Sequence, residues 1–122
     1  MENFDIFPNS MIEISRVLGL KVMNKRSVYL GNIKEVLMDY KIKKIAYVIL
    51  ASGGFLGIGK RFFPLPFFIL SYNTDRNVYV IDISEEKLKK APEFESKNGL
   101  VMCDKNWHYT LANFYECPPY WK

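Results

Sequence analysis

Apolar and polar residues alternate through much of the first two thirds of the chain, a pattern typical of β-strands. "MIEIS" (11–15) alternates in this way, and "GLKVM" (19–23) and "VYLG" (28–31) flank the polar "NKRS" as the two strands of a hairpin would. "NIKEVLMDY" (32–40) also fits helical spacing. Gly31 at its start and strands on both sides favour a strand with a bulge.

The strands that follow are more apolar. "KKIAYVILAS" (43–52) is apolar on both faces, so we expect it either inside a closed barrel or beneath a covering partner. "RFFPLPFFIL" (61–70) carries Pro64 and Pro66, whose missing N–H donors lie on the same side of a strand, at a free edge or a bend. "NVYVIDI" (77–83) follows the turn "NTDRN" and predicts another strand.

The period changes to a helical one near the end of the chain. Ser84 is a good N-cap residue with acidic residues directly after it, and Pro92 ends this short helix. A second helix is predicted from Asp104 to about Tyr115, with one apolar stripe made by Trp107, Leu111 and Phe114.

These elements predict a mainly β fold, a small antiparallel β-barrel of five to six strands with a short C-terminal helical tail. We expect an irregular lead-in over 1–10, the barrel over 11–94, and a tail over 95–122 that packs on the barrel.

Composition adds an expectation about surfaces. The chain has 122 residues, enough for one domain, and 16% of them are aromatic. A domain of this size cannot bury so many rings, so an apolar contact surface is expected. The acidic start and the lack of a long apolar run favour a cytoplasmic protein without membrane insertion. The two cysteines, Cys103 and Cys117, are expected to be reduced.

Charge is unevenly distributed along the sequence. Between Arg16 and Arg61 there are ten basic residues and only two acidic ones, Glu35 and Asp39. Lysines of this kind protect sheet edges from aggregation. They can also mark a nucleic-acid partner, in which case they should form one continuous face.

"SGGFLGIGKR" (52–61) matches a phosphate-binding loop from Gly54 to Lys60. Arg61 replaces the magnesium-binding hydroxyl, and two prolines occupy the place of the required helix, so we interpret the segment as a strand connection. Its large apolar residues either plug the barrel or contact another protein. The candidate partner-binding residues are Phe55, Leu56, Ile58, Lys60, Arg61, Phe62 and Phe63.

No catalytic, cofactor-binding or metal-binding set is predicted. Cys103, His108 and Cys117 supply at most three zinc ligands without paired spacing, and His108 is expected on the surface of the second helix. The aromatic residues of the tail are expected to pack it on the barrel; these are Trp107, Tyr115, Tyr120 and Trp121.

The ordered set of motifs resembles the PRC-barrel family across about residues 15–94. The matching features are S-x-x-L-G-x-x-V (15–22), G-x-I-x-x-V (31–36), "IAYVIL" leading into "GGFLGIG", "FFPLPFF", and "VYVIDISEEKLKKAPEF". The family is similar to the cytoplasmic barrel of the photosynthetic reaction-centre H subunit and to the C-terminal domain of the ribosome maturation factor RimM. One departure is at the first hairpin, where Arg26-Ser27 replaces a common glycine.

The resemblance implies a non-catalytic adaptor that docks onto other proteins, and we expect it to self-associate as a dimer. The alternative is an RNA- or ribosome-associated factor that uses the basic half of the barrel. A small-molecule or enzymatic role lacks a nucleophile with its base.

Overall fold

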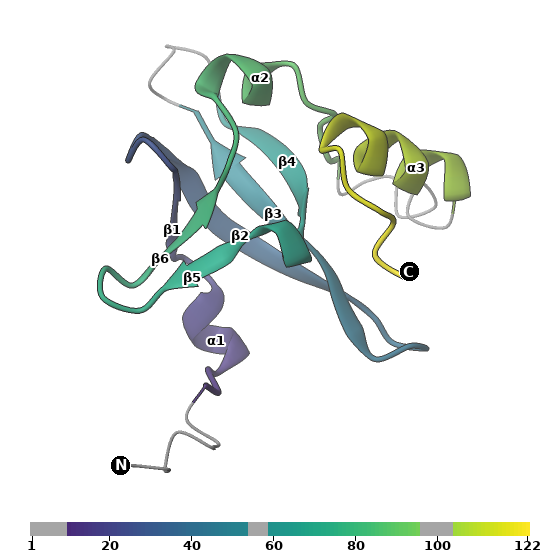
Figure 1. The fold of residues 1–122 in the computed structure, drawn as a ribbon, viewed down its shortest axis with the longest axis horizontal. Coiled ribbons are helices and arrows are strands. Elements are labelled where there is room, and N and C mark those ends of the chain that lie inside the picture. The colour runs from purple at the N-terminus through teal and green to yellow at the C-terminus, as the bar shows by residue number, and fades with distance from the viewer. Residues whose placement is uncertain (1–9, 54–58, 96–103) are drawn as a thin grey trace.

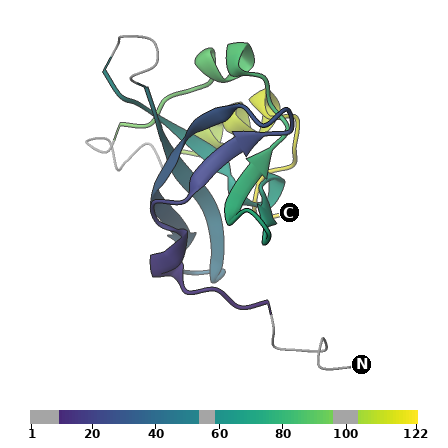
Figure 2. The same ribbon diagram turned by 90° about the vertical axis from the view of Figure 1, so that its left-hand side faces the viewer.

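One curved sheet of six strands organises the computed structural model, which describes residues 10–53, 59–95 and 104–122 (Figures 1 and 2). The strand order is β4-β3-β2-β1-β6-β5. The strands are β1 (Lys21–Asn24), β2 (Tyr29–Asp39), β3 (Lys44–Ser52), β4 (Arg61–Pro66), β5 (Ser71–Asn73) and β6 (Val78–Ile81). The helices are α1 (Ile14–Val17), the 3-10 turn η2 (Phe67–Ile69), α2 (Glu85–Lys89) and α3 (Lys105–Phe114).

The prediction of a mainly β, barrel-like fold with a C-terminal helix is confirmed. The sheet curls without hydrogen bonds closing it between β4 and β5 in the described residues. The pairs β1–β2, β2–β3, β3–β4 and β5–β6 are antiparallel, whereas β1 and β6 run parallel. A parallel pair needs a long connection, which the intervening β2 to β5 provide.

The bulge predicted for β2 is confirmed. Its register against β3 shifts between Ile33 and Glu35 and again between Leu37 and Met38. Each bulge changes which face the following side chains occupy, which accounts for the mixed periodicity of this segment. Gly31 is required here, because a Cβ atom at this position would lie 2.3 Å from the carbonyl oxygen of Ala51.

The strand predicted for "MIEIS" is wrong, because the chain forms the short helix α1 there. The backbone N–H of Leu18 donates to the carbonyl of Ile14, and that of Arg16 donates to Glu13. Only Val17 of α1 is buried, while Ile14 stays 47% exposed. The alternation at 11–15 therefore does not correspond to one face packed on a core.

Strand β3 is apolar on both faces because α3 covers its outer side. Val48 and Leu50 belong to the barrel core. Tyr47 lies on the opposite face of the strand, and its ring centroid is 5.5 Å from that of Trp107 in α3. Ile49 shares that face and is 1% exposed. Of the two alternatives drawn from the sequence, a covering element is therefore present, and the chain supplies it itself (Figure 1).

Strand β4 lies at one end of the sheet order, as its prolines indicated. The N–H of Phe94 donates to the carbonyl of Phe62 at 2.8 Å, so the backbone of Phe62 faces outward from the sheet. Pro64 and Pro66 follow at two-residue spacing, and their missing donors therefore face the same outer edge. The predicted strand ends at Pro66, where η2 begins, and the short strand β5 was not predicted.

Both predicted helices begin at their predicted caps. The Ser84 hydroxyl accepts from the N–H of Lys87 at 3.1 Å, and the Asp104 carboxylate accepts from the N–H of Asn106 at 2.9 Å. Leu111 is fully buried, and Trp107 and Phe114 are half-buried against the core. No described helix combines the length and apolar character needed to cross a bilayer.

Candidate docking surface at the end of the β2–β3 hairpin

The residues singled out around the glycine-rich loop have different environments. Phe55, Leu56 and Ile58 lie outside the described residues. Lys60 is exposed, and Phe62 is half-buried beneath the Lys34 ammonium group, 4.8 Å from its ring centroid. Phe63 is 2% exposed and part of the core. The structure therefore places Phe63 in the interior and leaves Lys60 at the surface.

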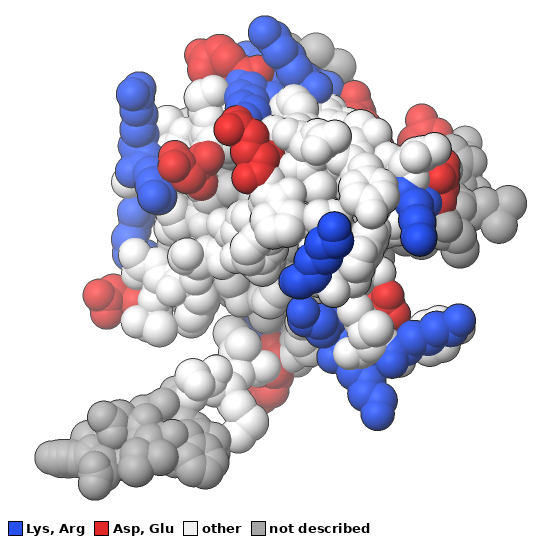
Figure 3. All heavy atoms as spheres, turned by 45° about the vertical axis from the view of Figure 1, so that its right-hand side comes forward, with Lys and Arg blue, Asp and Glu red and all other residues white. Residues whose placement is uncertain are grey.

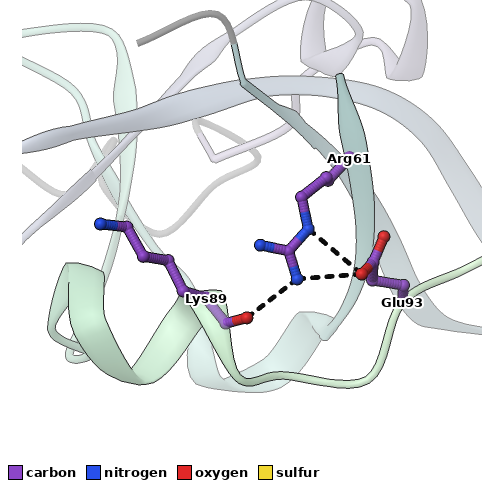
Figure 4. A network of polar contacts seen from close by, with 3 residues as sticks. All are labelled: Arg61, Lys89 and Glu93. Carbon is purple, nitrogen blue, oxygen red and sulfur yellow. Dashed lines mark hydrogen bonds and ion pairs between the residues drawn. The ribbon is translucent and has the colours of Figure 1, made fainter. Parts of the chain in front are cut away.

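Arg61 connects β4 to the last residue of α2 and to the segment after this helix (Figure 4). Its Nη2 donates to the carbonyl of Lys89 at 2.8 Å and to the carboxylate of Glu93 at 2.9 Å, and its Nε donates to the same carboxylate oxygen at 3.1 Å. A strand begins at Arg61, where a phosphate-binding loop would lead into a helix. The guanidinium group thus has a structural role within the chain.

The basic residues form separate groups. The β2–β3 register runs from Asn32 opposite Ala51 to Asp39 opposite Lys44. The β1–β2 turn with its basic side chains and Lys60 therefore lie near one end of these strands, and the lysines of the β2–β3 turn lie at the other. On the face shown in Figure 3, blue side chains occur in distinct groups, with acidic and uncharged side chains between them.

The hairpin end, residues 38–44, exposes large apolar side chains. Met38 is 61% exposed, Tyr40 76% and Ile42 43%. Asp39 shapes this turn, because its Oδ1 accepts from the N–H of Lys41 at 3.0 Å and from that of Ile42 at 3.3 Å. Aspartate commonly stabilises turns by such bonds to the following backbone. The turn consequently holds three apolar side chains in water.

A pocket of about 340 Å³ adjoins the hairpin end. Its lining is mostly apolar and comes from β2, β3, α3 and the C-terminal segment. The lining includes Leu37, Met38, Ala46, Tyr47, Trp107 and Tyr120. Figure 1 shows the C-terminus returning toward this hairpin.

Polar groups around the pocket are bonded to one another. The Tyr120 hydroxyl donates to Oδ2 of Asp39 at 2.5 Å, and Lys44 Nζ donates to the carbonyl of Tyr120 at 3.5 Å. The Tyr47 hydroxyl lies 2.7 Å from Nδ1 of His108. These bonds join the hairpin and β3 to the C-terminal part of the chain that forms the rest of the pocket.

The titration of these groups follows from their contacts. The Tyr120 hydrogen bond lowers the pKa of Asp39 below its usual 3.8. Desolvation, together with this bond, raises the pKa of Tyr120 to about 12. Burial raises the pKa of Tyr47 as well. At neutral pH both phenols are therefore protonated and Asp39 is ionised, a combination suited to binding rather than to proton transfer.

The expectation of a surface histidine is wrong. His108 is 8% exposed, and its ring stacks at 5.6 Å on that of Tyr47. Cys103 lies outside the described residues, and burial raises the pKa of the free thiol of Cys117. Within the described ranges, no three His, Cys, Asp or Glu side chains come together in a way that could hold a metal ion.

Sequence reasoning missed the hairpin end. Met38, Asp39 and Tyr40 were included in a strand, and the following lysines were counted only as charges. The signal was present: Tyr40 and Ile42 are large apolar residues in a lysine-rich turn between two strands, where polar residues are usual.

The fold and this surface define a small β-barrel domain whose C-terminal helix covers one face of the sheet and leaves the end of one hairpin open. The model of the PRC-barrel domain matches residues 9–88, and the chain belongs to this family. The division at residues 10 and 94 stays a prediction.

One solved structure that matches part of this chain is a putative 16S ribosomal RNA processing protein RimM from Pseudomonas aeruginosa. It is 18% identical, with a TM-score of 0.43, and the match covers 66% of this chain. The chain spans about half the length of that protein, since 50% of it is covered. No curated protein matches the chain.

Proposed function

We propose that this PRC-barrel chain is a non-catalytic docking module that binds another protein through its hairpin end. The observation that carries the proposal is the continuity of the exposed Met38, Tyr40 and Ile42 with the apolar pocket beside them. Interfaces are anchored by a few large apolar or aromatic side chains that fill pockets on the partner. Here Tyr40 can project into a partner while the pocket receives a side chain from it.

The bonding around the pocket supports binding over catalysis. The Asp39 carboxylate is occupied by the Tyr120 hydroxyl and two backbone N–H groups. The Tyr47 hydroxyl is paired with His108. An acid or base that takes part in a reaction must reach the substrate, whereas these groups hold the hairpin to the C-terminal segment and β3 to α3.

We also propose self-association into a homodimer. Its support is the further exposed apolar surface on other described elements, where Met11, Leu18 and Phe68 are 77%, 44% and 60% exposed. Light scattering over a range of protein concentrations tests this part alone. A constant monomer mass at high concentration would contradict self-association without affecting the docking proposal.

The docking proposal is tested by affinity purification from the native cell with the wild-type chain and Tyr40→Ser. The matched control is Tyr29→Ser, the same exchange at the opposite end of β2, where the ring is 46% exposed. We expect a defined set of proteins to be captured by wild type and Tyr29→Ser and lost with Tyr40→Ser. Equal capture by all three folded proteins would contradict the proposal.

RNA binding is the second candidate. It is favoured by Lys41, Lys43 and Lys44 beside the exposed ring of Tyr40, since stacking and phosphate contacts often occur together. The basic groups are separated and do not form the one continuous face expected of a nucleic-acid interface, so RNA binding has less support than protein docking. Titration with single-stranded RNA at low salt tests it, because phosphate contacts make affinity fall steeply as salt rises. Undetectable binding at low salt excludes it.

A further inference from the structure

The charges left without an ion pair at the hairpin end are positive. Asp39, the acidic residue of this turn, already accepts three hydrogen bonds. Lys41 and Lys43 are exposed, and in the described parts of the chain no carboxylate lies within ion-pair distance of either ammonium group. A partner that covers this surface therefore meets two cations that can still form ion pairs.

Both lysines lie on the turn that borders the pocket. Lys41 contributes to the pocket lining itself. The Lys43 backbone is held in a left-handed conformation (φ 60°), and its N–H donates to the carbonyl of Asp39 at 2.8 Å. The turn thus places the two lysines on the same short segment as Tyr40, rather than on separate neighbouring loops.

The pocket selects an apolar group. Leu37, Met38 and Trp107 provide hydrocarbon and indole surface, and Ala46 contributes a small side chain where a larger one would fill space. The polar atoms of Tyr47 and Tyr120 are already bonded to His108 and Asp39. A charged group placed against these apolar walls would lose its hydration, whereas an apolar group would not.

We infer that the hairpin end binds an extended segment of a partner protein in which a bulky apolar residue is flanked by Asp or Glu. The apolar residue enters the pocket, and the carboxylates face Lys41 and Lys43. This inference rests on the proposed docking function and names the chemistry of its partner. Complementary charge of this kind increases the association rate and rejects partners of the wrong sign.

The pocket favours a peptide over a membrane or RNA. Binding to an anionic membrane needs exposed apolar side chains and lysines, but a lipid surface offers no separate side chain that would fill the pocket. RNA would place phosphates at the lysines and a base on Tyr40, but the Tyr47 and Tyr120 hydroxyls are already bonded and do not offer themselves to a polar base edge.

The test uses fluorescence polarisation with short synthetic peptides that carry one Phe flanked by Glu. Matched peptides replace Phe by Ser or Glu by Lys. The proteins are wild type, Tyr40→Ser, the double variant Lys41→Glu/Lys43→Glu, and the control Lys25→Glu/Arg26→Glu at the β1–β2 turn. Phosphatidylserine vesicles and poly(U) RNA are titrated in parallel, and circular dichroism verifies that every variant is folded.

We expect wild type and the control to bind the Glu–Phe–Glu peptide with dissociation constants within about twofold of each other. The Lys41→Glu/Lys43→Glu variant should bind this peptide at least about tenfold more weakly. A tenfold change in the dissociation constant corresponds to about 1.4 kcal/mol of binding free energy. Either matched peptide should lose binding to wild type.

Two kinds of result overturn the inference. If the Lys-flanked peptide binds as well and the charge reversal has no effect, while Tyr40→Ser still loses binding, the acidic partner is wrong and the docking function stands. If vesicles or RNA bind with the same dependence on Lys41 and Lys43 and the peptides do not, or if none of the probes binds, the peptide partner is wrong. Failure of the docking function itself would appear separately, as equal capture by wild type and Tyr40→Ser from the cell.

Discussion

Ser27 has a backbone conformation that suits glycine. Its φ is 64°, in the left-handed region that costs an L-residue about 1 kcal/mol. The position follows Asn24, whose side-chain oxygen accepts from the N–H groups of Arg26 and Val28 at 2.9 Å each. The resembling family commonly has a glycine at this hairpin, and the positive φ of Ser27 gives a physical reason for it.

Ser27→Gly is therefore expected to raise the free energy of unfolding by about 0.5–1 kcal/mol. The gain comes from relief of the left-handed strain, reduced by the greater freedom of glycine in the unfolded chain. Urea denaturation measures it. Ser71→Gly in the exposed edge strand β5 is the control and should be destabilising, since its residue is not in a positive-φ conformation. Equal effects of the two changes would contradict the explanation.

Tyr120→Phe should raise the pKa of Asp39 toward its usual 3.8, because the hydrogen bond that lowers it is removed. A depressed carboxylate pKa contributes stability that is present above pH 3.8 and lost as the pH falls through the folded value. The wild type should therefore lose its advantage over Tyr120→Phe as the pH falls below this value.

NMR titration of the Asp39 carboxyl group measures the pKa directly, and denaturation at several pH values measures the difference in stability. Asp39→Asn removes the titrating group, so in this background the effect of Tyr120→Phe on stability should no longer depend on pH. An unchanged Asp39 pKa in Tyr120→Phe would show that the bond does not control it.

At the scale of elements, helix α3 acts as an outer layer on the sheet. Leu111 lies in the middle of the helix and is completely buried. Leu111→Ala should lower the free energy of unfolding by about 2–5 kcal/mol through lost burial and the cavity left behind. Thr110→Ala, one residue earlier on the exposed side, should change it by no more than about 0.5 kcal/mol. Thermal denaturation of both variants tests whether the helix is an integral part of the core.

Elements with strong local signals could be predicted from the sequence. The strand over 43–52, the bulged strand before it and the two capped helices all carry their patterns within a few residues. The α1 region carries no such signal. Its few alternating residues fit a strand, although local hydrogen bonds form a helix there. The pairing of β1 with β6 depends on residues far apart in the chain, and no local pattern specifies it.

The candidate site was less predictable for a similar reason. The loop at 53–59 attracted attention by its glycines, whereas the pocket combines β2, β3, α3 and the last residues of the chain. His108 shows the difficulty most clearly, because its burial depends on the distant Tyr47. Charge counts located the lysines but did not place them at opposite ends of the strands.

At the scale of the whole molecule, the C-terminal segment completes the barrel. Removal of residues 96–122 would expose the outer face of β3 and β4, including Ile49 and Pro64, which are nearly inaccessible in the full chain. We expect the shortened chain to bind a hydrophobic dye strongly and to form large soluble aggregates. Light scattering coupled to size-exclusion chromatography measures this. A monomer with unchanged melting temperature would mean that the tail is dispensable.

The edge of β4 limits how copies of this barrel can meet. A strand from a second molecule would need N–H donors along the outer side of β4, but Pro64 and Pro66 have none, and the carbonyl of Phe62 is already bonded to Phe94. Strand addition, the route by which sheets grow into fibrils, is therefore blocked along this border. A partner at this border must instead join through side-chain surfaces, so β4 does not serve as a template for polymerisation.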